Sequence, residues 1–157
     1  MAGQILIPLD GSEPSESALP HALALARRLE AGLILLHVVP PSAYLAGELA
    51  VSPELQQREE EYAADYLQKV AARLEGMDVE WHVRRGDPAQ AILDFAERQP
   101  VDLIVLSSRG RSGIPRWLFG SVAERVVRHA PVPVMVVHPG QATLGTRTAA
   151  AGAAGEV

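Results

Sequence analysis

Glycine, serine and arginine gather in two neighbouring stretches in the last third of the chain. Residues 107–113 read Ser-Ser-Arg-Gly-Arg-Ser-Gly, and Gly120-Ser121 directly precedes an apolar pattern of helical spacing. Glycines let backbone amides approach an anion closely, and the unpaired N–H groups at a helix start favour negative charge. With Arg109 and Arg111 as cations, the pattern is compatible with a phosphate site. It is equally compatible with a plain helix cap and solvated arginines.

The sequence lacks the better-known phosphate loops and catalytic patterns. A P-loop needs a lysine before its serine, but Gly120 precedes Ser121, and the first apolar run is not followed by Gly-x-Gly-x-x-Gly. Residues 110–113 are one residue short of a nucleophile elbow, and the five histidines show no metal-ligand spacing. Hydrolysis of a nucleotide needs a group that positions water, and no such set is recognisable.

A second polar turn follows the first apolar run. Residues 5–9 read Ile-Leu-Ile-Pro-Leu and end at Asp10-Gly11-Ser12, with Ser12 as the candidate N-cap of a helix that Gly32 ends. Pro20 should kink this helix or mark where its regular part starts. Asp10 is either a site carboxylate or a turn residue that bonds its own backbone.

Short apolar runs alternate with longer segments of helical spacing, which is typical of βαβ units. Further strands are predicted at residues 33–39, 79–83, 103–106 and 132–137, with 79–83 at an edge. Helices are predicted from Pro53 to about Gly76, from Pro88 with Asp87 as N-cap, and from Gly120 to about His129 with Val127 on its buried side. Right-handed crossovers then give an α/β fold, a doubly wound five-stranded parallel sheet in the order 3-2-1-4-5 with helices on both faces. The loops after the first and fourth strands meet where the strand order reverses, which is where such sheets bind ligands.

Composition narrows the class of protein. The 157 residues include no cysteine and carry a net charge of −5, which excludes a disulfide scaffold and a thiol enzyme and argues against nucleic-acid binding. No apolar stretch is long enough to span a bilayer, so a membrane is not an expected partner. Because of the negative net charge, a nucleic acid is not an expected partner either. A cytoplasmic location is expected. Residues 140–157 are rich in alanine and glycine, which predicts a disordered tail after a domain of residues 1–139.

The run from residue 107 to residue 137 resembles the C-terminal signature of the universal stress protein family. Residues 7–12 (Ile-Pro-Leu-Asp-Gly-Ser), 37–39 (His-Val-Val) and 86–89 (Gly-Asp-Pro-Ala) resemble further motifs of that family, so the resemblance covers residues 4–138. The nucleotide-binding branch carries Gly-x2-Gly-x9-Gly-Ser/Thr, which falls on Ser107, Gly110, Gly120 and Ser121. Ser107 departs from the motif's first glycine. A positive φ there would strain a serine, whereas an ordinary φ would tolerate it.

The resemblance implies an ATP site in the crevice. It places Asp10 near the ribose and the phosphates, which the carboxylate tolerates when Mg²⁺ is shared between them. It places the adenine against the Val39 backbone. The implied nucleotide-binding residues are Pro8, Leu9, Asp10, Val39, Ser107, Arg109, Gly110, Gly113, Gly120, Ser121 and Val122.

The resemblance also implies a regulatory stress-response protein that binds ATP with little or no turnover. A homodimer is expected through residues 132–137, an apolar last strand that is otherwise an open edge. One alternative is a dimer of the same family that binds no nucleotide, with Ser107 as its indication. The other is a slow ATPase or autophosphorylating protein, with Ser121 or Ser112 as acceptor.

Overall fold

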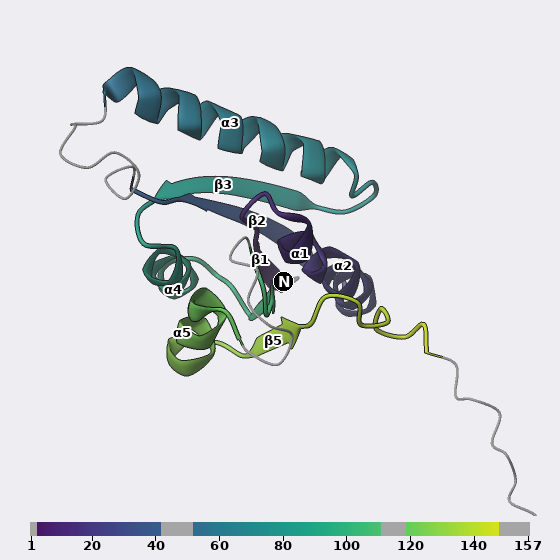
Figure 1. Ribbon diagram of the computed structural model, residues 1–157. Coiled ribbons are helices and arrows are strands. Elements are labelled where there is room, and N and C mark those ends of the chain that lie inside the picture. The colour runs from purple at the N-terminus through teal and green to yellow at the C-terminus, as the bar shows by residue number, and fades with distance from the viewer. Residues whose placement is uncertain (1–2, 42–51, 111–118, 148–157) are drawn as a thin grey trace, which may run out of the picture.

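The computed structural model describes residues 3–41, 52–110 and 119–147 (Figure 1). Five parallel strands form one sheet in the order β3-β2-β1-β4-β5, which confirms the predicted fold and strand order. The strands are β1 (Gln4–Pro8), β2 (Gly32–Val39), β3 (Val79–Arg85), β4 (Leu103–Ser107) and β5 (Val134–Val137). β1 and β4 are neighbours at the centre, so the reversal point lies between them.

Helices cover both faces of this sheet. α1 (Glu13–Glu16), α2 (Ala18–Leu29) and α3 (Pro53–Ala72) lie on one face, and α4 (Pro88–Arg98) and α5 (Ser121–His129) lie on the other (Figure 1). Because side chains alternate along a strand, each strand feeds two cores. On β2, for example, Leu33 and Leu35 pack toward α2 and α3, while Ile34 and Leu36 pack toward α4 and α5. Within the described residues, no helix combines the length and the apolarity that crossing a bilayer requires.

The helical segment after β1 differs from its prediction. Ser12 is the N-cap of α1, as predicted, but α1 ends at Glu16 and α2 begins at Ala18. Pro20 therefore lies in the first turn of α2, where a missing N–H leaves no helical bond unmade, and marks the start of the regular helix. Gly32 as the end of the helix is wrong, because Glu30 adopts the left-handed conformation (φ 53°) and Gly32 already belongs to β2.

The start of β5 and the buried side of α5 also differ from their predictions. β5 begins at Val134 rather than at Val132, because Pro133 lacks an N–H, and its carbonyl instead accepts the N–H of Ile104. Val127 is 43% exposed, so the buried side of α5 is formed by Ala123 and Val126. Residues 138–141 and 143–146 form hydrogen-bonded turns, in which Gln141 N–H donates to the His138 carbonyl and Thr146 N–H to the Thr143 carbonyl. Residues 148–157 lie outside the described residues, and the predicted domain boundary stays a prediction.

β3 forms one edge of the sheet and carries charged side chains, among them Glu80 and Arg84. Its last residue, Arg85, donates to Glu59 at 3.1 Å, to Glu60 at 3.2 Å and to the Gln56 carbonyl at 3.0 Å. These bonds fasten the first half of α3 to the carboxyl end of β3. The packing of α3 on the sheet itself is formed by Ala63, Leu67 and Val70.

α4 begins at a cap that also contacts α5. The Asp87 carboxylate accepts the N–H of Gln90 at 3.0 Å and pairs with Arg125 of α5 at 2.7 Å. The hydrogen bond from the Gln90 N–H is the main reason that the pKa of Asp87 is lowered, and Arg125 adds to it. Pro88 follows as the first helical residue, where its fixed φ suits the helix.

Replacing Asp87 with alanine should lower the free energy of unfolding by about 1 kcal/mol, because the N-cap bond is lost. Asp87→Asn is the matched control, since its amide oxygen still caps the helix while the ion pair is gone. A group whose folded pKa is lowered stabilises the fold above its unfolded pKa and loses that contribution as the pH falls through the folded value. Urea unfolding should therefore show the gap between wild type and Asp87→Asn closing in acid, and a gap that widens there would contradict the assignment.

Candidate functional site

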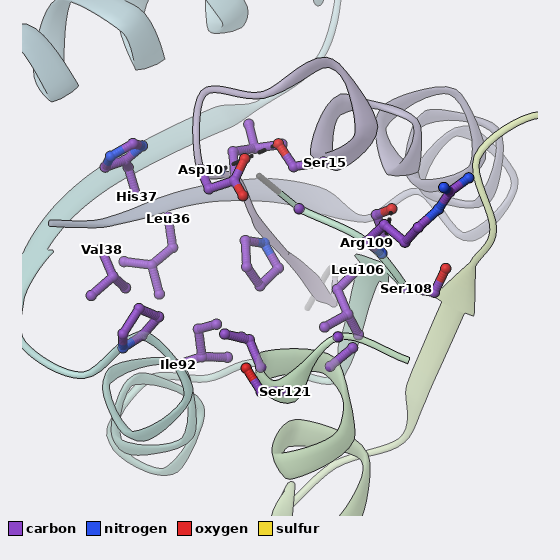
Figure 2. Close-up of a pocket in the computed structure, with 18 of the residues that line it drawn as sticks. Asp10, Ser15, Leu36, His37, Val38, Ile92, Leu106, Ser108, Arg109 and Ser121 are labelled. Carbon is purple, nitrogen blue, oxygen red and sulfur yellow. Dashed lines mark hydrogen bonds between the residues drawn. The ribbon is translucent and has the colours of Figure 1, made fainter. Parts of the chain in front are cut away.

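A cavity of about 280 Å³ opens at the carboxyl ends of β1 and β4 (Figure 2). Nine of the predicted site residues line it, and they come from the ends of β1 and β4, the loops that follow them and the start of α5. They are Pro8, Leu9, Asp10, Ser107, Arg109, Gly110, Gly120, Ser121 and Val122. Gly113 lies outside the described residues. The fold therefore brings together the two loops that the sequence pattern associates with a ligand.

Asp10 is held in a tight turn at the mouth of this cavity. Its Oδ1 accepts the backbone N–H of Ser12 at 2.9 Å and the Ser12 hydroxyl, and Gly11 between them has a φ of 84°. The Asp10 N–H donates to the Ser15 hydroxyl at 3.3 Å. Asp10 is thus both a turn residue and a cavity residue, because one carboxylate oxygen forms the turn while the side chain lines the crevice.

Gly110 lies directly against the other oxygen of that carboxylate. A Cβ built on Gly110 would overlap Asp10 Oδ2. Glycine at position 110 therefore lets the loop after β4 pass close to Asp10, and any larger residue would require the carboxylate to turn away. The contact also defines where Oδ2 lies, at the junction of the two loops.

Ser107, which replaces the motif glycine, is accommodated without backbone strain. Among the described residues other than glycine, Glu30 is the one with a positive φ, so Ser107 has an ordinary strand conformation as the last residue of β4. Its side chain is 8% exposed, and its Oγ accepts the N–H of Arg109 at 3.2 Å and a hydrogen bond from Ser17 Oγ at 3.3 Å. The hydroxyl thus ties the loop after β4 to the junction of α1 and α2.

The start of α5 faces the same cavity without a side-chain cap. Gly120 is the N-cap residue, and its N–H donates to the Ser108 carbonyl at 2.8 Å. The next three residues, Ser121, Val122 and Ala123, all line the cavity. Their N–H groups belong to the first turn of a helix and have no acceptor within it, so they carry the partial positive charge of the helix N-terminus.

Val39, which is predicted to line the site through its backbone, faces the end of β3 rather than the cavity. Val39 is absent from the lining, and its carbonyl accepts the N–H of Gly86 beyond the end of β3. Val38 lines the cavity, two residues past the last pair of β1 and β2, Pro8 with Leu36. Because consecutive residues of a strand face opposite neighbours, the Val38 backbone faces the side that β1 no longer covers.

One end of the cavity is apolar, and most of this end was not predicted. It is lined by Leu36, Val38, Pro40, Pro88 and Ile92. Figure 2 shows the side chains of Leu36, Val38 and Ile92 on one side of the cavity and those of Ser108 and Arg109 on the other. The signal that could have found them is strand alternation, since Ile34, Leu36 and Val38 all point to the α4 face.

The side chain of Tyr66, on α3, lies beside His37 of β2 at the wall of the crevice near Asp10. His37, a lining residue, contacts the ring of Tyr66 edge-on, with centroids 5.9 Å apart. Burial raises the pKa of Tyr66, and the negative charge of the nearby Glu16 raises it further. Glu16 in turn pairs with Arg73. The phenol therefore stays neutral over the physiological pH range, and this wall of the crevice contributes no additional anion.

The open α/β sheet with a polar crevice at the reversal point is the arrangement that defines the doubly wound class of proteins. A family model described as the universal stress protein family matches residues 1–138. Universal stress protein MJ0531 of Methanocaldococcus jannaschii is 36% identical over 138 residues, which cover 85% of this chain and 81% of that protein. The chain belongs to the universal stress protein family.

Solved structures agree with this assignment. The structure of hypothetical protein MJ0577 matches with a TM-score of 0.78 and 32% identity, covering 90% of this chain and 99% of that chain. A universal stress protein in complex with cAMP matches with a TM-score of 0.59 and 26% identity, covering 87% of this chain and 97% of that chain.

Replacing Ser107 with alanine should lower the free energy of unfolding by about 1 kcal/mol, because the bonds to Arg109 and Ser17 are lost. Ser107→Gly should cost up to about 1 kcal/mol more, since glycine gains freedom in the unfolded chain. Ser121→Ala is the control, because Ser121 is exposed and should change stability by less than about 0.5 kcal/mol. Urea unfolding measures all three, and a Ser107→Gly protein as stable as wild type would show that the hydroxyl stabilises nothing.

Proposed function

We propose that this protein binds ATP with Mg²⁺ in the crevice and acts in the cytoplasm as a nucleotide-dependent regulator with little or no turnover. The observation that carries the proposal is the uncapped N-terminus of α5, which faces the crevice opposite Asp10 and Gly110. A related protein was solved in complex with cAMP, which supports an adenine nucleotide as the ligand class.

The apolar end of the cavity suits the base of a nucleotide, and the end at the start of α5 suits its phosphates. An adenine ring would lie at the apolar end against Leu36, Val38 and Ile92, where the backbone of Val38 can hydrogen-bond the edge of the base. The phosphates would lie against the N–H groups of Ser121 and Val122, where the helix dipole favours negative charge. The apolar end and the helix start lie about the same cavity, so one ligand can reach both.

Mg²⁺ fits this arrangement only together with the nucleotide. Among the described residues there is no group of three or more acidic or histidine side chains that could hold a metal ion. Asp10 is the single carboxylate of the described lining, and Mg²⁺ usually binds one or two carboxylates together with substrate phosphates. Mg²⁺ supplies positive charge between the phosphates and Asp10, which would otherwise repel each other.

Binding without rapid turnover follows from the chemistry of the lining. The acid–base side chains among its described residues are Asp10 and His37. His37 lies beside Leu36 and Val38, away from Ser121 at the start of α5 (Figure 2). Asp10 would share the metal ion, so it is not placed as a general base. This favours a regulatory role over the slow ATPase alternative.

Titration calorimetry should show micromolar binding of ATP that weakens strongly when Mg²⁺ is withheld, and weaker binding of AMP. Gly110→Ala should abolish the dependence on Mg²⁺, because the added Cβ displaces the Asp10 carboxylate. The fold should survive, since the atom displaced is the end of a side chain.

Gly3→Ala is the control for this titration, because Gly3 also lacks a positive φ and its added Cβ also approaches a carboxylate, that of Asp102, but outside the crevice lining. Absence of ATP binding by folded, nucleotide-free wild type would overturn the proposal and favour the nucleotide-free dimer. Retention of labelled phosphate after denaturation would favour autophosphorylation.

We also propose a homodimer in which β5 pairs across a two-fold axis. β5 pairs with β4 on one side and forms the other edge of the sheet. Val134, Met135 and Val136 on this edge are half-buried, which leaves apolar surface beside an open row of backbone groups. An antiparallel copy of the same strand would satisfy that row and cover the surface.

Val136→Lys should convert the dimer to a monomer, because a lysine at the paired edge would place like charges across the two-fold axis. Light scattering coupled to size exclusion measures the mass at micromolar concentration. Glu80→Lys on the opposite edge strand is the control and should leave the mass unchanged. Circular dichroism must show that both variants are folded, and a monomeric wild type would contradict the proposed dimer.

A further inference from the structure

Ser108 connects three parts of the fold that meet at the polar end of the crevice. Its N–H donates to the Val137 carbonyl of β5 at 2.8 Å, and its carbonyl accepts the N–H of Gly120 at 2.8 Å. Its side chain is 1% exposed. The position of the α5 N-cap therefore depends directly on how Ser108 is held.

His138 completes this arrangement from the end of β5. A hydrogen bond joins His138 Nδ1 and Ser108 Oγ at 2.8 Å. The imidazole is stacked on the ring of Phe119, with centroids 5.8 Å apart and an interplanar angle of 21°. The His138 N–H donates to Gln141 Oε1 at 2.9 Å. Backbone and ring contacts thus fix the imidazole on two sides.

The Ser108 hydroxyl is directed toward the end of β5 rather than into the crevice (Figure 2). Because it is buried, it needs a partner, and removing that partner leaves an unsatisfied polar group beside the Gly120 amide. His138 follows β5 and Phe119 precedes the N-cap of α5, so their ring contact joins the two segments beside the Ser108 bond. Ser108 lines the crevice, whereas its partner His138 is not among the described lining residues.

We propose that His138 is a positioning residue for nucleotide phosphates: it fixes Ser108, and Ser108 fixes the Gly120 amide and the first turn of α5. This inference rests on the proposed ATP site and adds to it a residue that does not touch the ligand. A shift of the α5 N-terminus weakens contacts to the phosphates but leaves the apolar end unchanged. Loss of the bond therefore lowers affinity for ATP more than affinity for AMP.

Three variants separate the hydrogen bond from the ring contact. His138→Phe keeps a ring that stacks on Phe119 but cannot bond Ser108, and Ser108→Ala removes the same bond from the other side. His138→Asn loses the ring but presents an amide near the position of Nδ1. His138→Phe and Ser108→Ala should each lower ATP affinity about fivefold, which is the usual weight of one hydrogen bond. His138→Asn should restore most of it.

AMP affinity, measured by the same calorimetry, should change by less than about twofold in all three variants, since one hydrogen bond at the phosphate end bears mainly on the outer phosphates. Equal losses for ATP and AMP would reveal a general structural defect and overturn the positioning role. Unchanged ATP affinity in His138→Phe would overturn it as well.

Hydrogen exchange of the Gly120 amide tests the same link without any nucleotide. Exchange should be faster in His138→Phe and Ser108→Ala than in wild type, and close to wild type in His138→Asn. If wild type binds no ATP, the proposed function fails, and the exchange rates still decide the positioning role. Equal exchange in wild type and His138→Phe would overturn the inference whatever the outcome of the titration.

Discussion

The whole site depends on the divergence of two connections at the centre of the sheet. After β1 the chain crosses to the face that carries α1 and α2, and after β4 it crosses to the face that carries α5. Because neighbouring connections leave in opposite directions, none of the described helices covers the strand ends between them. Polar backbone groups are left there, and a ligand can satisfy them. The same divergence explains why a loop near residue 10 meets a loop near residue 110.

Serine hydroxyl groups form several of the hydrogen bonds that hold those loops in place. Ser12 bonds the Asp10 carboxylate, Ser107 bonds the Arg109 amide, and Ser108 bonds His138. Short side chains of this kind reach backbone groups one to three residues away without filling the crevice. The Ser107 side chain thus restrains the loop after β4 through hydrogen bonds that a glycine could not form, while its backbone keeps an ordinary conformation.

The sheet order, the crevice and nine of its nineteen described lining residues could be predicted from the sequence, because alternating apolar runs and helical segments leave few allowed topologies. That Val38 rather than Val39 lines the cavity could not be predicted, since a motif gives the end of a strand but not which neighbour each peptide faces. Gly32 was misread as a helix end because Glu30 adopts a left-handed conformation that few residues other than glycine adopt. His138 could not be found from sequence, because its contact with Ser108 spans 30 residues of chain.

The two edges of the sheet differ in chemistry. β3 presents charged side chains, and its last arginine is already engaged with α3, whereas β5 is a short apolar strand. Strand addition is therefore discouraged at one edge and favoured at the other. A sheet that can extend from a single edge stops growing once two copies have joined. The charge on β3 would thus limit the proposed pairing through β5 to a closed dimer rather than an open-ended fibre.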